Sequence, residues 1–96
     1  MLSWSKLGRF VIISTSSSID HDNIIGDYVN ITPGVITGGG VRIGEGSFIG
    51  MGTIIFPEVT IGRRCIIGAG SLVRHDVPDE ALAYGKPAEA VGRARK

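Results

Sequence analysis

The residues best suited to chemistry are a histidine between two carboxylates, Asp20-His21-Asp22. Histidine suits proton removal because imidazole exchanges a proton in the physiological range. A neighbouring carboxylate can hold the ring in one tautomer and stabilise the imidazolium that forms. Asp22 and Asp20 both qualify for that role, and the sequence alone does not choose between them. The motif predicts a general base at His21, and the alternative is a solvated surface histidine among charged neighbours.

Length and composition exclude several classes of protein. A chain of 96 residues forms one small domain, which buries about two-thirds of its unfolded surface and leaves little room for a deep private pocket. Ten Lys and Arg against nine Asp and Glu create no basic field for nucleic acid or an anionic membrane. Cys65 is the one cysteine, which excludes an internal disulfide and a cysteine-based zinc site and fits a reducing cytosol. The early apolar run at 10–13 is too short for a signal peptide or a membrane span.

A six-residue repeat must position these groups. Stepping by six from Leu7 to Val73 meets a large aliphatic residue at every position except Thr37. A second column, two residues earlier in each hexad, holds small or β-branched residues and is broken only by Asn23. Such a period excludes an α-helix, and the alternation within each hexad is typical of a strand. Glycine directly after the inward aliphatic, as at Gly26 and Gly44, is expected to supply the turns because it tolerates positive φ.

Short strands joined by a turn in every hexad predict an all-β fold, a triangular parallel solenoid with three hexads per coil. Residues 1–78 are expected to form about four such coils, and residues 79–96 a C-terminal cap on the open strand edges within the same domain. The first predicted edge of the prism holds His21, Gly39, Pro57 and His75, and the second holds Pro33, Met51 and Ala69. His75 lies three coils, about 14 Å, from His21, so the two share neither a proton nor a metal ion. We therefore expect His75 to be a surface residue and expect no metal site.

The sequence resembles the left-handed parallel β-helix (hexapeptide-repeat) acyltransferases, and the resemblance covers about residues 7–93. Its tail, Gly85-Lys86-Pro87-Ala88, is similar to the exit segment of that family. The segments 19–22, 25–29 and 38–44 are most similar to bacterial sugar O- and N-acetyltransferases that act on sialic acid or nucleotide amino sugars. The left-handed sense of the coil is implied by this resemblance.

The resemblance implies an acetyl-CoA-dependent transfer of an acetyl group to an amine or hydroxyl of a sugar or sugar nucleotide. It assigns His21 as the general base and Asp22 as the acidic residue that follows it. It also implies a cytoplasmic homotrimer with acetyl-CoA in a groove between subunits. The residues that it places along the cofactor are Asn30, Gly39, Met51, Ala69 and Lys86.

Some residues depart from the family pattern. Asn30 stands where a second histidine is common, and it keeps hydrogen-bonding capacity without a charge. Glu89 replaces a frequent cation, so Lys86, Arg93, Arg95 and Lys96 are the alternatives for cofactor phosphates. The glycine run Gly38-Gly39-Gly40 next to Thr37 is expected to admit the cofactor, and a plain irregular turn is the alternative.

Three functional classes follow. The first is the sugar acetyltransferase. A γ-class carbonic anhydrase, which has the same prism, needs three converging histidines, and this sequence has two. The third is a non-catalytic trimerising module that lacks its sugar-binding partner domain, since relatives usually carry an N-terminal βαβ domain and here the repeat begins at Leu7. Outward apolar residues predict the oligomer in each case: they are Phe48, Ile54, Phe56, Ile66 and Leu72.

Overall fold

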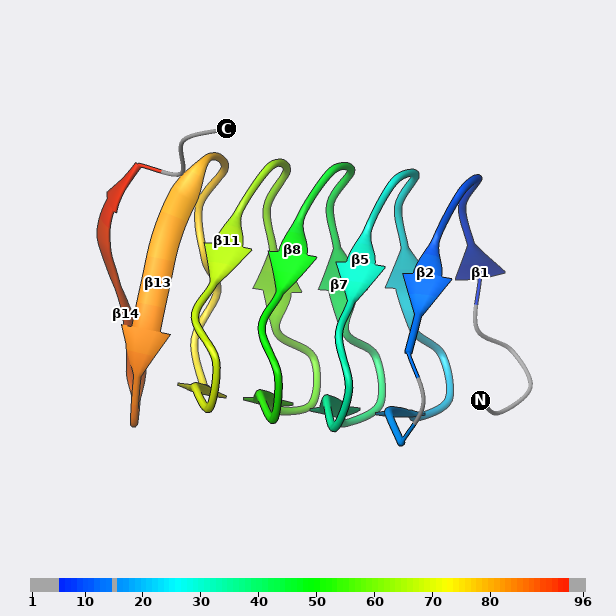
Figure 1. The fold of residues 1–96 in the computed structure, drawn as a ribbon, viewed down its shortest axis with the longest axis horizontal. Helices are drawn as coiled ribbons and strands as arrows, with labels where there is room; N and C mark the ends of the chain where they lie inside the picture. Colours follow the sequence, from blue (N-terminus) through cyan, green and yellow to red (C-terminus); the bar gives the residue numbers. More distant parts are fainter. Residues whose placement is uncertain (1–5, 15, 94–96) are drawn as a thin grey trace.

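The molecule is a solenoid of short parallel strands wound around three flat faces (Figure 1). The computed structural model describes residues 6–14 and 16–93. Face A consists of β1 (Lys6–Leu7), β4 (Ile24–Ile25), β7 (Arg42–Ile43) and β10 (Thr60–Ile61). Face B contains β2 (Ile12–Ile13), β5 (Asn30–Ile31), β8 (Phe48–Ile49) and β11 (Ile66–Ile67). Face C consists of β3 (Ser18–Ile19), β6 (Ile36–Thr37), β9 (Ile54–Ile55) and β12 (Leu72–Val73).

Successive strands on a face pair in parallel, one coil apart along the chain, as Ile25 does with Ile43. The first residue of each strand points outward and the second inward, because side chains alternate along a strand. From Ile19 to Val73 the inward column is buried, and Ile31, Ile49 and Ile67 are 0 % exposed. On the first described strand, by contrast, Leu7 is 40 % exposed. The predicted solenoid and its apolar interior are confirmed.

The expected role of the glycines that follow the inward aliphatics is wrong. Positive φ occurs two residues after those glycine positions, at residues such as Tyr28 (60°), Gly40 (72°) and Gly46 (73°). Gly44 is required for a different reason: a Cβ there would lie 2.6 Å from the carbonyl carbon of Gly62 on the next coil. These glycines therefore allow the backbones of successive coils to approach closely at the corners.

The register changes after Val73. Ile66 pairs with Phe48 on the coil before it and with Leu82 on the coil after it, and Ile61 bridges Val77. The corner that contains His75 is therefore two residues shorter than the corners before it. His75 is exposed, as expected, and it lies in this shortened corner between faces C and A, where the regular six-residue spacing no longer holds.

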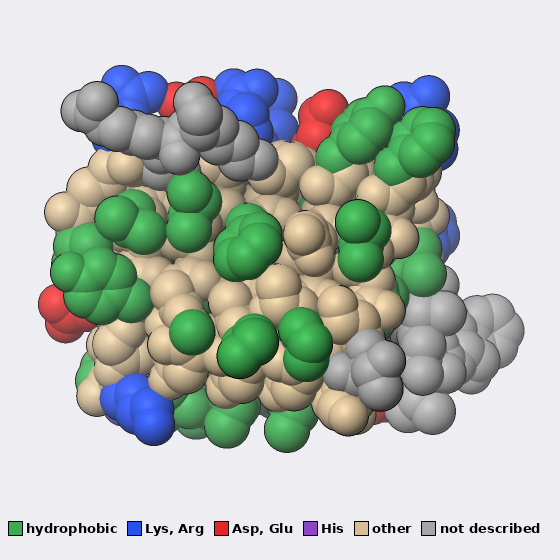
Figure 2. Space-filling model, viewed as in Figure 1, with side chains coloured by type: hydrophobic (Ala, Val, Ile, Leu, Met, Phe, Trp, Pro, Cys, Tyr) green, Lys and Arg blue, Asp and Glu red, His purple; other side chains and the backbone are tan. Residues whose placement is uncertain are grey.

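A hairpin follows this shortened corner and extends face B (Figure 1). It consists of β13 (Ala81–Gly85), which pairs in parallel with β11, and β14 (Ala88–Arg93), which pairs antiparallel with β13. Figure 2 shows the same side of the molecule, with hydrophobic side chains scattered over the strands and charged ones concentrated along the margins. Phe48, Ile54 and Phe56 are exposed as expected, whereas Ile66 and Leu72 are half-buried. The described residues contain no helix long and apolar enough to cross a membrane.

Candidate active site

The Asp20-His21-Asp22 segment forms the corner between β3 on face C and β4 on face A. Asp20 Oδ1 accepts a hydrogen bond from the backbone N–H of His21 at 2.7 Å. Asp22, which has a φ of 60°, places its Oδ2 3.1 Å from His21 Nδ1. Both the imidazole and the Asp22 carboxylate are exposed. The two carboxylates that the sequence could not separate therefore differ: Asp22 contacts the ring, and Asp20 caps the backbone.

This arrangement has a direct chemical consequence. A carboxylate beside Nδ1 favours the tautomer that carries its proton on Nδ1, which leaves the lone pair on Nε2. The same carboxylate attracts an imidazolium once Nε2 takes up a proton. The geometry can therefore serve a general base whose reactive atom is Nε2.

The glycine run lies against His21. A Cβ added to Gly39 would lie 3.0 Å from Cε1 of the ring, so the Gly39 backbone forms a surface on which the ring rests. The N–H of Gly40 donates to the carbonyl oxygen of His21 at 3.2 Å. The predicted placement of His21 and Gly39 on one edge is confirmed.

Two residues that the sequence singled out only as exceptions lie in the core beneath this corner. Asn23 is 0 % exposed and Thr37 is 3 % exposed, and Asn23 Nδ2 donates to Thr37 Oγ1 at 2.6 Å. In the sequence each of them is a break in one of the two columns, and their contact was not predicted. The sequence did contain a signal for this contact, because each column has a single exception. Asn23 directly follows the Asp20-His21-Asp22 segment, and Thr37 directly precedes the glycine run on the next coil.

The remaining predicted cofactor residues lie elsewhere on the same chain. Asn30 is half-buried on face B, and Met51 and Ala69 are exposed at the corner between faces B and C. Lys86 is exposed in the turn between β13 and β14. None of them is separated from His21 by a whole number of coils, so none of them lies on the edge of the prism that contains His21. A single chain does not bring these residues to His21.

The alternative cations for phosphate binding are not equivalent. Arg93 forms an ion pair with Glu80, which also accepts a hydrogen bond from Arg64 at 2.6 Å. The hydrogen bond from Arg64 and then that from Arg93 hold the pKa of Glu80 below its usual value, and the Glu80 contact raises the pKa of Arg64. Arg93 is thus engaged by a carboxylate in this structure. Arg95 and Lys96 lie outside the described residues.

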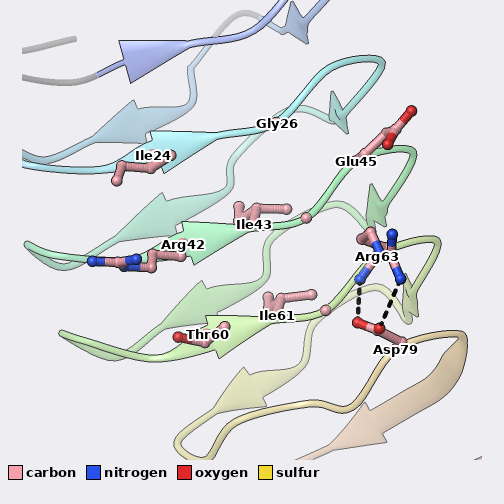
Figure 3. A pocket seen from close by; sticks show the side chains of 11 residues that line it. Ile24, Gly26, Arg42, Ile43, Glu45, Thr60, Ile61, Arg63 and Asp79 are labelled. Carbon is pink, nitrogen blue, oxygen red and sulfur yellow. Dashed lines mark hydrogen bonds and ion pairs between the residues drawn. The ribbon is translucent and has the colours of Figure 1, made fainter.

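Two surface hollows formed by the described residues do not include His21. The first lies on face A (Figure 3), with Ile24, Arg42 and Thr60 on one side and Glu45 and the Arg63–Asp79 ion pair on the other. The second lies on face B and includes Asn30 beside the stacked rings of Phe10 and Tyr28, whose centroids are 5.2 Å apart. Within the described ranges, no group of three or more His, Cys, Asp or Glu residues is placed to hold a metal ion.

Comparison with known proteins connects this geometry to a family. Residues 40–75 match the family model described as bacterial transferase hexapeptide (six repeats). The acetyltransferase domain of PglB from Neisseria gonorrhoeae, solved in complex with acetyl coenzyme A, has a TM-score of 0.90 and is 36% identical over 92% of this chain and 43% of that chain. The chain belongs to the hexapeptide-repeat, left-handed β-helix acyltransferase family.

Other members of this family differ in the acceptors that their names state. Serine acetyltransferase 3, mitochondrial, of Arabidopsis thaliana is 36% identical over 98 residues, which is 92% of this chain and 25% of the relative. A variant of perosamine N-acetyltransferase from Caulobacter crescentus, in complex with CoA and GDP-perosamine, has a TM-score of 0.82 and is 31% identical over 95% of this chain and 52% of that chain. The chain spans about a quarter of the length of the curated relatives that it matches.

Proposed function

We propose that this chain supplies the acetyl-transfer site of an acetyl-CoA-dependent acetyltransferase, with His21 as the general base. The observation that carries the proposal is the His21 ring, held by the Asp22 carboxylate at 3.1 Å and resting on the Gly39 backbone. The family members solved with acetyl-CoA or CoA support it. We further propose that the protein acts in the cytoplasm.

The proposed reaction uses two groups of this site, the His21 imidazole and the Asp22 carboxylate. His21 Nε2 removes the proton from an acceptor amine or hydroxyl as that nitrogen or oxygen attacks the thioester carbonyl carbon. Asp22 stabilises the imidazolium that forms. When the tetrahedral intermediate collapses, the C–S bond breaks and the CoA sulfur leaves with the proton from the imidazolium. The acetyl group is then bonded to the acceptor, and His21 is neutral again.

The oxyanion of that intermediate needs a hydrogen-bond donor, for which the glycine run is the nearest source. The N–H of Gly38 already donates to the carbonyl of Ile55, and that of Gly40 to the carbonyl of His21. Among the described residues, the N–H of Gly39 has no backbone acceptor. We therefore assign the donor to Gly39, whose lack of a side chain also allows the thioester to approach closely.

We propose that the site is completed by a second chain in a homotrimer. Asn30, Met51, Ala69 and Lys86, proposed to line the cofactor, lie away from His21 on the same chain. A long, thin cofactor can contact both groups only in a groove between two copies. Exposed apolar side chains at Phe48, Ile54 and Phe56 support an interface of this kind, since a small monomer rarely exposes so many.

For the acceptor, we propose a sugar or a sugar nucleotide. The family member solved with GDP-perosamine favours this class. Serine is the second candidate, because serine acetyltransferases match over 92% of the chain or more. A non-catalytic trimerising module is the alternative to both enzymes.

The first experiment is a calorimetric titration of the purified protein with acetyl-CoA. We expect saturable binding with about one site per chain, weakened by salt because the ligand is anionic. Amino sugars, their nucleotide derivatives and serine are then compared as acceptors by release of free CoA thiol. A folded trimer that binds no acetyl-CoA would overturn the enzyme proposal in favour of the non-catalytic module, and turnover with serine alone would overturn the sugar acceptor.

Gly39→Ala should lower kcat by about tenfold or more, because a small displacement of a catalytic group is enough for such a loss. The added Cβ would lie 3.0 Å from His21 Cε1, so the ring must shift. The φ of Gly39 is outside the left-handed region, so the free energy of unfolding should change by less than about 1 kcal/mol. Steady-state kinetics and urea unfolding check both expectations. Gly92→Ala is the control, since a Cβ there meets no atom within 4 Å; wild-type kcat in Gly39→Ala would contradict the placement of the ring.

A further inference from the structure

The hydrogen bond between Asn23 and Thr37 joins the two exceptions in the inward columns of the solenoid. On the next coil, the positions equivalent to Asn23 and Thr37 are Val41 and Ile55, and both are buried. Aliphatic residues therefore suffice at these positions to build a coil. A buried amide and a buried hydroxyl, by contrast, destabilise the core unless their hydrogen bonds are made.

The hydrogen bonds of this pair converge on one peptide segment. Thr37 Oγ1 accepts from the backbone N–H of Asp20 at 3.1 Å. Asn23 Nδ2 donates to the carbonyl oxygen of Asp20 at 3.0 Å. Both backbone polar groups of the residue that precedes His21 are thus bound by the pair.

The pair also reaches the second half of the site. Asn23 Oδ1 accepts from the backbone N–H of Val41 at 2.7 Å, and Val41 directly follows the glycine run. Thr37 directly precedes that run. The run from Gly38 to Gly40 is therefore bounded on both sides by members of one buried network, and the corner of His21 is bound to the same network.

Thr53 has a buried hydroxyl that plays no such part at the His21 corner. Thr53 Oγ1 donates to the carbonyl oxygen of Gly68 at 3.2 Å. This hydrogen bond satisfies one carbonyl group in a part of the solenoid that contains no predicted general base. Thr53 is 0 % exposed, so it offers a matched comparison for Thr37.

We propose that Asn23 and Thr37 are positioning residues that fix the orientation of His21 and its position along the solenoid axis relative to Gly39. This inference rests on the proposed acetyl transfer for its effect on rate, but its structural content does not. The network binds the Asp20 peptide from the core, while the Asp22 carboxylate contacts the imidazole at the surface. Because the pair is buried, its action does not depend on how copies of the chain assemble.

The test is the isosteric substitution Thr37→Val, compared with Thr53→Val and with Thr37→Ser. In Thr37→Val we expect kcat to fall about 10- to 100-fold, as a small misplacement of a base can produce, with KM for acetyl-CoA within about twofold of wild type. Thr37→Ser keeps the accepting oxygen and should restore most of kcat. Thr53→Val removes a buried hydroxyl of the same kind and should leave kcat unchanged, while its urea midpoint falls at least as much as that of Thr37→Val.

Amide hydrogen exchange supplies a readout that is independent of turnover. In Thr37→Val the amides of Asp20 and Val41 should exchange at least about tenfold faster than in wild type, because local opening becomes easier, and in Thr53→Val they should not. Unchanged exchange at both amides would overturn the proposal, as would a loss of kcat in Thr53→Val equal to that in Thr37→Val. If wild type transfers no acetyl group to any acceptor, the proposed function fails, and the exchange rates still decide whether the pair orders the His21 corner.

Discussion

Replacing His21 with asparagine is expected to lower kcat for acetyl transfer by about 10²- to 10⁴-fold, which is the usual contribution of a positioned general base. Asparagine approximates the shape of the ring but does not accept the acceptor's proton. Binding of acetyl-CoA should stay within about threefold of wild type, because in the proposed mechanism His21 acts on the proton of the acceptor. Thiol-release kinetics measure the first quantity and calorimetry the second.

The second histidine provides the control for this experiment. His75 is exposed and lies in the shortened corner that follows β12. His75→Asn should leave kcat within about twofold of wild type, as expected for a solvated side chain without a role in proton transfer. The assignment of the base would be refuted by a His21→Asn protein that is as active as wild type. Comparable losses in the two variants would refute it too.

The second large effect concerns stability. Ile49→Ala should lower the free energy of unfolding by about 2–5 kcal/mol, because it removes a fully buried side chain from a column that the neighbouring coils cannot close. Ile49 is 0 % exposed, and it is packed between Ile31 and Ile67 of the coils before and after it. Urea unfolding at a fixed protein concentration, with the m-value compared between variants, measures the change.

Ile24→Ala is the matched control. Ile24 is the first residue of β4 on face A and points outward, with 40 % of its surface exposed. Its truncation should lower the free energy of unfolding of the chain by less than about 1 kcal/mol. If the two variants had equal midpoints, the inward column would not be the source of stability in this solenoid.

The sequence predicted the fold well because every part of the repeat carries the same local pattern. An inward aliphatic in every hexad specifies both the strand and the face that it buries. The position of Gly39 below His21 follows from the same arithmetic, since three hexads return the chain to the same corner. The roles of His21, Asp22 and the cofactor residues at Asn30, Met51, Ala69 and Lys86 stay predictions, because they concern bound molecules and the proposed second chain.

Two expectations about the backbone failed for one physical reason. The role of Gly44 was misread because the backbone that excludes a Cβ belongs to Gly62, on the next coil. The shortening of the coil after Val73 was missed because it becomes visible only when Val77 pairs with Ile61. Both features depend on contacts between coils, and a pattern within one hexad carries no information about them.

By itself the sequence determined the repeat, the buried column and the edge shared by His21 and Gly39, because these follow from a constant spacing. Only the tertiary structure decided that Asp22 contacts the imidazole while Asp20 caps the backbone, since both directly flank His21. It also decided that Asn23 and Thr37 meet in the core. These two residues are 14 apart, which is not a multiple of six, so they belong to different columns. Side chains of different columns come together only when three faces close around one interior.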